Sequence, residues 1–224
     1  MGRSLLQARR RCHWSPPLTR QDAAVYSIGH STHSIGTFVA LLKETRVAAI
    51  ADVRSTPYSR WRPQFNRDAL RSSLAEHNIA YVFLGTELGG RGTDGSARDE
   101  HGRILYRYIA ESAEFREGLR RVRAGSESMR LALMCAESEP LDCHRGILIS
   151  RFLVAQGTRV LHIHTDGQLE THRDAERRLL RLMSLHELDL FRTEDQILAD
   201  AYERQEARIA HVMLNTPTED EALR

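Results

Sequence analysis

Short apolar runs alternate with longer amphipathic stretches along most of this chain. The apolar runs predict five strands, at Val25–Gly29, Val47–Val53, Ile79–Leu84, Arg130–Cys135 and Arg159–His164. The amphipathic stretches predict helices over Ile35–Glu44, Arg67–His77, about Tyr106–Val122, His144–Gln156, Thr171–Leu185 and about Glu194–His211. Strands that are apolar on both faces and alternate with helices indicate βαβ units around a buried parallel sheet. The predicted fold class is therefore α/β, a three-layer sandwich with a mostly parallel sheet of about five strands.

The 224 residues fit one ample domain with an extension at each end. Residues 1–24 contain five arginines before the first acid, Asp22, and are interrupted by Pro16-Pro17. We expect them to form a basic, disordered extension, of the kind seen in organelle transit peptides or in bacterial tails. Residues 25–185 are predicted to form a single α/β domain, and residues 186–224 a helical C-terminal extension.

Composition narrows the class of protein. No apolar run approaches the ~20 residues that a membrane span requires, so we expect no membrane partner. Three cysteines are too few for a disulfide framework, which favours a reducing cytoplasm. The net charge is only +2, but Lys43 is the sole lysine, so the positive charge is nearly all arginine. Arginine suits forked contacts with phosphate or carboxylate. Nothing in the sequence indicates an oligomeric state.

Polar or small residues follow each of the five predicted strands. In open parallel α/β sheets, ligands bind at the carboxyl ends of the strands. The residues placed there are His30, Asp52, Arg54, Glu87, Cys135, Glu137, His162 and His164. Their convergence on one edge of the sheet predicts a functional site.

The segment from Cys135 to Gly146 runs from a strand, through a loop, into a helix. Asp142 is a suitable N-cap, which would place Cys143, His144 and Arg145 in the first helical turn. The positive end of a helix lowers the pKa of a nearby thiol and binds anions through free backbone N–H groups. The Arg145 guanidinium adds a fixed cation. This segment therefore predicts a reactive thiol beside an anion site.

The two cysteines allow several interpretations. Cys135 or Cys143 can be a thiolate nucleophile activated by the helix end, Arg145 and a histidine. Both can bind zinc together with a histidine, although seven intervening residues are not the usual short ligand spacing. They can also form a reversible disulfide, or Cys135 can be a small buried residue without chemistry. The sequence assigns no cofactor.

Two further loops carry candidate binding residues. After the second strand, arginines alternate with aromatic residues, namely Arg54, Arg60 and Arg62 with Tyr58, Trp61 and Phe65. Proteins grip phosphates and stack on bases with such pairs, although the same aromatics can pack onto the domain. Between Leu84 and Arg103 lie six of the chain's fourteen glycines, which is typical of a lid, a binding loop or a disordered segment. These glycines match neither a dinucleotide fingerprint nor a Walker-type phosphate loop.

Taken in order, the motifs resemble those of one family. They are Tyr26-Ser-Ile-Gly-His-Ser-Thr32, Asp52-Val-Arg54 with Pro57, Ser59, Arg60, Pro63 and Phe65, Leu84-Gly85 with Leu88-Gly89-Gly90, Cys135-x-Glu137 with Cys143-His144-Arg145, and His162-Ile163. From about Val25 to Leu185 the chain is similar to the domain-of-unknown-function 488 family. The resemblance implies an α/β domain in a cytoplasmic, mostly prokaryotic protein. It implies no activity, since the family is named for the lack of an assigned function.

These residues favour an enzyme that acts on a phosphate-bearing substrate, either a nucleotide or a nucleic acid. The expected catalytic residues are Cys135, Glu137, Cys143, His30 and Asp52, with a cysteine or Glu137 as nucleophile or base and His30 transferring protons. The expected substrate-binding residues are Arg54, Arg60, Glu87, His144 and Arg145, with Arg54 and Arg145 holding the anion. The alternatives are a nucleic-acid-binding module without catalysis and a domain with a structural Cys/His metal site.

Overall fold

A six-stranded sheet with the order β3-β2-β4-β1-β5-β6 forms the centre of the molecule. The computed structural model describes residues 24–92, 98, 104–185 and 191–215, with the side chains of 210–215 excepted. The strands are β1 (Val25–Gly29), β2 (Ala49–Asp52), β3 (Ala80–Phe83), β4 (Leu131–Cys135), β5 (Val160–Ile163) and β6 (Leu169–Thr171). Strands β1 to β5 pair in parallel, and β6 pairs antiparallel with β5. The predicted α/β class with a mostly parallel sheet is confirmed.

Helices follow the strands in the order that the sequence predicts, with one additional short helix directly after β3. They are α1 (Ile35–Glu44), α2 (Arg67–Ala75), α3 (Gly85–Leu88), α4 (Tyr106–Glu111), α5 (Ala113–Ser128), α6 (Arg151–Ala155), α7 (His172–Leu182) and α8 (Glu194–Asn215). Two short 3₁₀ segments, η1 (Pro63–Phe65) and η2 (Pro140–Asp142), and a π-helical segment, η3 (Arg145–Ser150), complete the set. The single helix expected from Tyr106 is divided at Ser112. This residue is extended, and its hydroxyl caps α5 by accepting from the N–H of Phe115.

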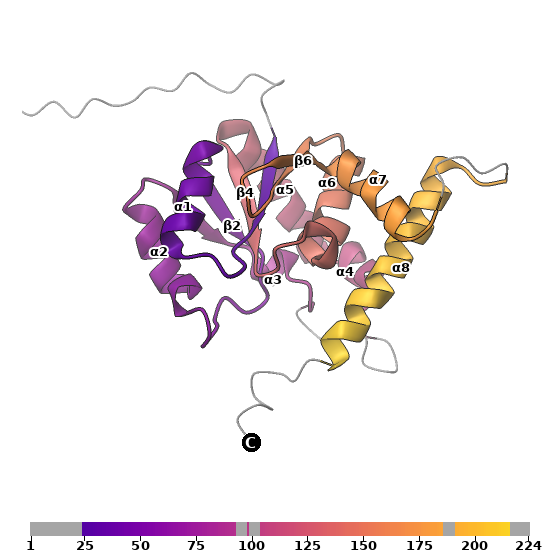
Figure 1. Cartoon of the computed structure of the whole chain (residues 1–224), viewed down its shortest axis with the longest axis horizontal. Helices are drawn as coiled ribbons and strands as arrows, with labels where there is room; N and C mark the ends of the chain where they lie inside the picture. Colours follow the sequence, from indigo (N-terminus) through magenta and orange to yellow (C-terminus); the bar gives the residue numbers. More distant parts are fainter. Residues whose placement is uncertain (1–23, 93–97, 99–103, 186–190, 216–224) are drawn as a thin grey trace, which may run out of the picture.

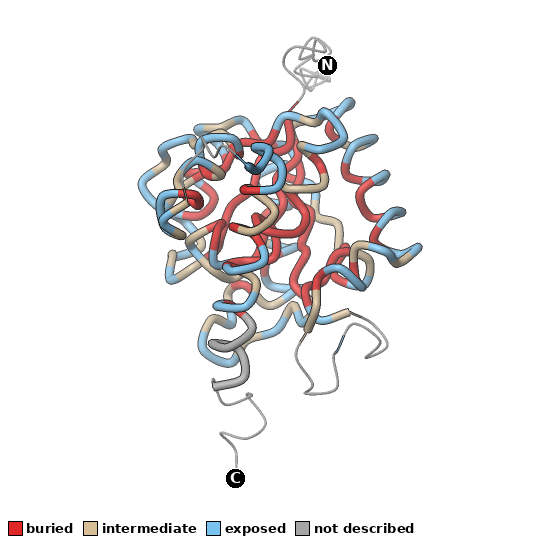
Figure 2. Tube along the Cα trace, turned by 90° about the vertical axis from the view of Figure 1, so that its right-hand side faces the viewer, coloured by how far each residue is buried: buried red, intermediate tan, exposed pale blue. Residues whose placement is uncertain are grey.

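Successive residues of each strand point to opposite faces of the sheet and so build two cores. On one face, Ile28 and Ile50 pack with residues of α1 and α2. On the other face, Ala51 and Leu133 pack with residues of α4 to α8. Figure 1 shows α1 and α2 on one side of the strands and α5 to α8 on the other, and Figure 2 shows the buried positions concentrated in the centre. The predicted three layers are present.

The sixth strand has no counterpart among the predicted elements. Leu169–Thr171 has only three residues, and β6 lies at the edge of the sheet with a single partner strand. An edge strand that is half-exposed, with Leu169 at 50% exposure, lacks the continuous apolar run that identifies the inner strands.

Helix α8 corresponds to the last predicted helix and packs on the same core as α4 to α7. Its buried residues in that core are Ile197, Ala201, Tyr202 and Ile209. Nearly all of the predicted basic extension, residues 1–23, lies outside the described residues, and so do residues 186–190. No helix in the part of the chain that the structure describes has both the length and the apolar character of a membrane span.

Candidate functional site

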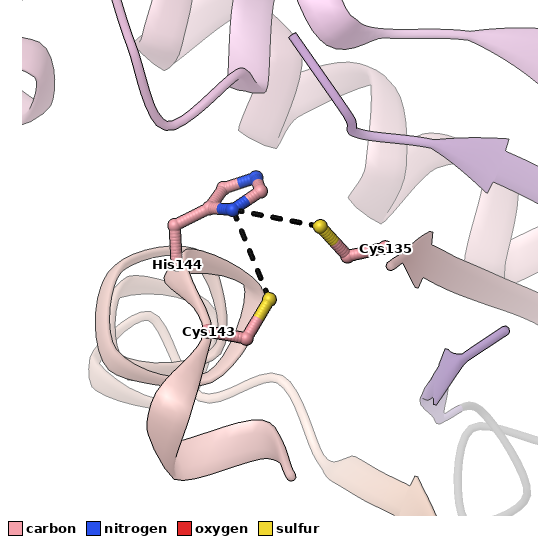
Figure 3. Close-up of side chains that lie close together, drawn as sticks. All are labelled: Cys135, Cys143 and His144. Carbon is pink, nitrogen blue, oxygen red and sulfur yellow. Dashed lines mark hydrogen bonds between the residues drawn. The ribbon is translucent and has the colours of Figure 1, made fainter. Parts of the chain in front are cut away.

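A buried cluster of two thiols and one imidazole lies at the carboxyl edge of the sheet. Cys135 is the last residue of β4, whereas Cys143 and His144 lie between η2 and η3. Nδ1 of His144 is 3.7 Å from Sγ of Cys135 and 3.8 Å from Sγ of Cys143 (Figure 3). The three residues are only 3%, 1% and 6% exposed, and their candidate ligand atoms all lie within 4.8 Å of one another. The loop between β4 and η3 therefore brings both cysteines and a histidine together.

The orientation of the His144 ring is set by its other nitrogen. Nε2 lies 2.9 Å from the carbonyl oxygen of Val53, which can only accept a hydrogen bond. Nε2 therefore carries a hydrogen, and in the neutral ring the lone pair of Nδ1 faces the two sulfur atoms. The glycine-rich loop packs against the same ring, since a Cβ on Gly90 would lie 2.8 Å from Cγ of His144.

The start of the helix after the cysteines differs from the prediction. Asp142 ends η2, and its carboxylate accepts from Nε2 of Gln205 at 2.8 Å, so the predicted N-cap role of Asp142 is wrong. The backbone N–H of Arg145 instead donates to Sγ of Cys143 at 3.4 Å. A backbone N–H at the start of the helical segment thus donates to the sulfur. This agrees with the expectation that the start of a helix stabilises a nearby thiolate.

The guanidinium of Arg145 is buried and donates inward. Its Nε bonds to Oγ of Ser27 at 3.1 Å, and its two terminal nitrogens bond to the carbonyl oxygens of Glu137 and Ser138 at 2.7 and 2.8 Å. Only 1% of the residue is exposed. Its two terminal nitrogens therefore hold the loop between β4 and η2, and Nε ties this loop to β1. The anion-binding role expected of Arg145 gains no support from these contacts.

The environment separates the acidities of the two thiols. Burial opposes ionisation of Cys143, but a hydrogen bond from Cys135 and the charges of Arg145 and His144 hold its pKa well below the usual value. The hydrogen bond to Cys143, together with burial, raises the pKa of Cys135. Burial also disfavours the charged ring of His144, yet the neighbouring Cys143 raises the pKa of His144 overall. Of the two thiols, Cys143 therefore ionises more readily.

Two further ionisable side chains, the carboxylate of Glu137 and the phenol of Tyr106, lie near the cluster. Glu137 is half-buried, and its Oε2 is buried without a hydrogen-bond partner among the described residues. Burial and then the charge of Cys143 raise the pKa of Glu137. Tyr106, the first residue of α4, lies near enough for burial and the charge of Cys143 to raise the pKa of its phenol. No feature of the sequence points to Tyr106, because it occupies an ordinary apolar position of a predicted helix.

His30, Asp52 and Arg54 form a second cluster on the opposite face of the sheet. Asp52 is in register with Met134, which packs toward α1 and α2, whereas Cys135 packs toward the other core. Arg54 bonds to both carboxylate oxygens of Asp52, from Nε at 2.9 Å and from Nη2 at 2.6 Å. The predicted site is therefore divided into two neighbouring clusters.

The ring of His30 completes the second cluster. It stacks on Phe65 with a centroid separation of 4.3 Å, and its Nε2 lies 3.4 Å from Nη1 of Arg54. Burial and then the charge of Arg54 lower the pKa of His30 to about 4, so the ring is neutral near pH 7. Tyr81 donates its hydroxyl hydrogen to Asp52 at 2.8 Å, a contact from the next strand that the sequence does not indicate.

Two predicted substrate-binding residues lie outside both clusters. Glu87, on α3, forms an ion pair with Arg121 of α5. Arg60 is exposed, and its Cζ lies 4.7 Å over the ring of Trp61. The structure thus groups Glu137 and Arg145 with the Cys/His cluster, but it does not bring Glu87 or Arg60 to it.

The comparison with known families covers the central part of this structure. The model of a domain of unknown function, DUF488, matches residues 34–152, which is more than half of the chain. The chain belongs to the DUF488 family. The match contains the whole Cys135–Arg145 segment and the Asp52–Arg54 pair, whereas His30 lies outside it. No curated protein and no solved structure matches this DUF488 chain.

Behind the cluster, this DUF488 domain contains a buried chain of hydrogen bonds that starts at Nε of Arg145. The chain continues through Ser27, His162, His172, Tyr202 and Glu176, with separations of 3.1 Å for the first bond and 2.9 Å for each of the others. This chain of hydrogen bonds connects β1, β5, α7 and α8 to Arg145, which follows directly after the Cys/His cluster. Among the residues of this hydrogen-bonded chain, the sequence singles out only His162, because it lies near the end of a predicted strand. Most of the other residues are far apart in the sequence, and no motif connects them.

Proposed function

We propose that Cys135, Cys143 and His144 bind a divalent metal ion of the zinc type, and that this domain functions as a metalloprotein. The observation that carries the proposal is the orientation of His144, with Nε2–H on the carbonyl of Val53 and Nδ1 facing both sulfurs. Metal-binding histidines commonly donate their second ring N–H to a carbonyl or carboxylate, which fixes the tautomer that ligates.

The two sulfur–nitrogen separations suit tetrahedral coordination. With bonds of about 2.3 Å to sulfur and about 2.05 Å to nitrogen, separations of 3.7 and 3.8 Å correspond to sulfur–metal–nitrogen angles of about 116° and about 122°. Two thiolates and one neutral imidazole are also the ligand types that zinc prefers. The unusual sequence spacing is explained by η2, which folds the seven residues between the cysteines back onto the end of β4.

The charges around the cluster support the same assignment. A divalent ion with two thiolates is neutral, which suits a site that is almost fully buried. The N–H of Arg145 on Sγ of Cys143 is the kind of outer contact that stabilises a thiolate ligand. Both cysteines are free, as thiolate ligation needs, and this supports the cytoplasmic location expected from the sequence.

Burial favours a structural role for the metal. Bound at the cluster, it would join the end of β4 to the start of η3, and His144 would extend the link to Val53 after β2. A structural metal contributes its binding free energy to folding. We therefore expect removal of the metal to lower the stability of the whole domain.

A second candidate function, an enzyme acting on a phosphate-bearing substrate, is favoured by one observation. Glu137 places the unpartnered Oε2 beside a cluster that supplies three protein ligands. Hydrolytic metal sites keep a fourth position open for water and use a neighbouring carboxylate to accept its proton. Neither Arg145 nor the Asp52–Arg54 pair adds support for a phosphate group, because most of their polar contacts are internal.

Metal analysis of the full chain tests the proposal. Protein purified under reducing conditions without chelator should contain about one equivalent of zinc per chain, and Cys143→Ser and His144→Ala should each lose it. Cys12→Ser, at the remaining cysteine, and His77→Ala, at a histidine outside the cluster, should retain it. Wild-type protein stripped of metal should bind Co²⁺ with thiolate-to-cobalt absorption. A folded, stripped wild type that gives no such absorption contradicts the proposal without any variant.

The second candidate has its own test. The metal-loaded wild type and Glu137→Gln are assayed with phosphate mono- and diesters. Turnover in the wild type that is lost in Glu137→Gln, with the metal content unchanged, supports a catalytic centre. Absence of turnover in the metal-loaded wild type would refute the enzyme proposal and leave the structural metal site as the function of the cluster.

A further inference from the structure

The loop between β2 and α2 exposes two aromatic rings at the carboxyl edge of the sheet. In this segment, residues 55–66 and here called the Arg–aromatic loop, Trp61 is 71% exposed and Tyr58 is 60% exposed. Cζ of Arg60 lies 4.7 Å from the centroid of the Trp61 ring. Since the guanidinium lies over one face and most of the residue remains exposed, the opposite face of the ring is available to a ligand.

The exposure does not result from a loose loop. The N–H of Arg67 bonds to the carbonyl of Pro57 at 3.0 Å, and the N–H of Ser59 bonds to Oδ1 of Asn66 at 2.7 Å. Phe65 is fully buried beneath His30 and fixes the end of the loop in the core. The backbone is thus held in place while the rings point outward, which lowers the conformational entropy that a ligand would have to remove.

The charged side chains of the Arg–aromatic loop are all positive. Residues 55–66 contain no acidic residue, whereas Arg60 and Arg62 lie within them; Arg67 and Asp68 follow directly as a pair of opposite charges. Asp52 is buried and occupied by Arg54, so it does not offset these arginines at the surface. A rigid positive surface with an open aromatic face is complementary to a polyanion that carries flat rings.

We propose that the Arg–aromatic loop binds single-stranded nucleic acid, with one base stacked on the free face of Trp61 and with Arg60 and Arg62 contacting phosphates. Single strands are favoured over duplexes because only unpaired bases offer a free π-face to a stacking side chain. The proposal is independent of the metal centre, since the loop contributes no ligand to it.

A second arginine–aromatic pair elsewhere on the surface lacks these properties. Cζ of Arg107 lies 4.9 Å from the centroid of Tyr108, which is 41% exposed. The carboxylates of Glu206 and Glu111 act on the same guanidinium, so this surface carries acids as well as bases. The pair therefore provides a matched control on α4, with the same chemistry but without the uniform charge.

Fluorescence anisotropy of the full chain tests the proposal, with a labelled oligothymidylate and a blunt duplex of equal length as probes. The wild type should bind the single strand more tightly than the duplex. Trp61→Ala should weaken that binding about ten- to hundredfold, the usual effect of losing one stacked base. Arg60→Gln and Arg62→Gln should each reduce the slope of log K against log salt by about 0.7. Tyr108→Ala and Arg107→Gln should change neither quantity.

Several outcomes would overturn the proposal. One is a wild type that does not bind the oligothymidylate. Another is Trp61→Ala binding as tightly as Tyr108→Ala, which would assign the binding to other basic residues, such as those before Asp22. A duplex that binds more tightly than the single strand would exclude stacking. Loss of binding to anionic vesicles in Trp61→Ala, without any oligonucleotide binding, would assign the loop to a membrane surface instead.

Discussion

Nε2 of His162 lies 2.9 Å from Nδ1 of His172 in the interior, and the direction of this hydrogen bond follows from its neighbours. Tyr202 donates its hydroxyl hydrogen to Glu176, so Nε2 of His172 must be the donor to the Tyr202 oxygen. Nδ1 of a neutral His172 then accepts from Nε2–H of His162. Nδ1 of His162 in turn accepts from the hydroxyl of Ser27. Both rings are neutral Nε2–H tautomers.

These tautomers can be observed directly. Nitrogen–proton correlation spectra at pH 7 should show, for both His162 and His172, a protonated Nε2 and an unprotonated Nδ1. Burial holds the pKa of both rings below the usual value. An Nδ1–H tautomer or a doubly protonated ring at either position would contradict the direction of the hydrogen bonds along this chain.

The same burial makes stability depend on pH. Burial lowers the pKa of His172 from 6.5 to about 4, so the unfolded chain binds a proton in this window that the folded chain does not. Stability should therefore fall as the pH falls from about 6.5 to about 4, with a contribution from His172 of about 2–3 kcal/mol by pH 4.5. Urea unfolding of His172→Gln should show a correspondingly smaller pH dependence, with His77→Gln as the control. Identical pH profiles for wild type and His172→Gln would refute this.

Arg145 should be the most sensitive arginine in the domain. Its replacement by Gln leaves two partly buried carbonyls and the buried Ser27 hydroxyl without their donor, and each buried group left unsatisfied costs about 1–3 kcal/mol. We expect the free energy of unfolding to fall by about 3–5 kcal/mol. Arg123→Gln, at an exposed arginine whose guanidinium donates to Gln156, should change it by less than about 0.5 kcal/mol. Equal effects in denaturant titrations would show that Arg145 does not hold the loop.

Two glycines should respond oppositely to the same substitution. A Cβ on Gly29 would overlap the carbonyl of Glu137, so Gly29→Ala has to displace the loop behind Cys135 and should cost more than about 2 kcal/mol. Gly125, inside α5, has no atom nearer than 3.8 Å to such a Cβ, and alanine there should stabilise the domain by about 0.5–1 kcal/mol. Thermal unfolding of both variants measures the difference, and a stabilising Gly29→Ala would exclude the close approach.

The inner strands can be predicted because each is buried on both faces and therefore apolar throughout. The bounds predicted for β1, Val25–Gly29, agree with the structure to the residue. β6 cannot be predicted in this way, since its pairing with β5 depends on the turn that precedes it and not on a hydrophobic run. The break at Ser112 also escapes the pattern, because its capping hydroxyl lies inside a continuous helical periodicity.

For the candidate site, the sequence indicates which residues gather but not which way they point. Strand alternation and loop position are enough to place Cys135, Cys143 and His144 together. The orientation of Arg145 depends on two carbonyls in a loop whose path no residue pattern specifies. The alternation of side chains across the sheet directs Asp52 and Cys135 to opposite faces, so the structure groups them in two neighbouring clusters at its carboxyl edge.

The position of β1 inside the sheet also dictates an order of assembly. Val25 pairs with Leu131 on one side and with Val160 on the other, so β1 leaves the ribosome long before either of its neighbours. Strands β2 and β3 can meet much earlier. Such distant pairings slow folding and leave strand edges open in the meantime. A newly made chain of this topology therefore carries the apolar β1 without either of its neighbouring strands until β4 and β5 have emerged.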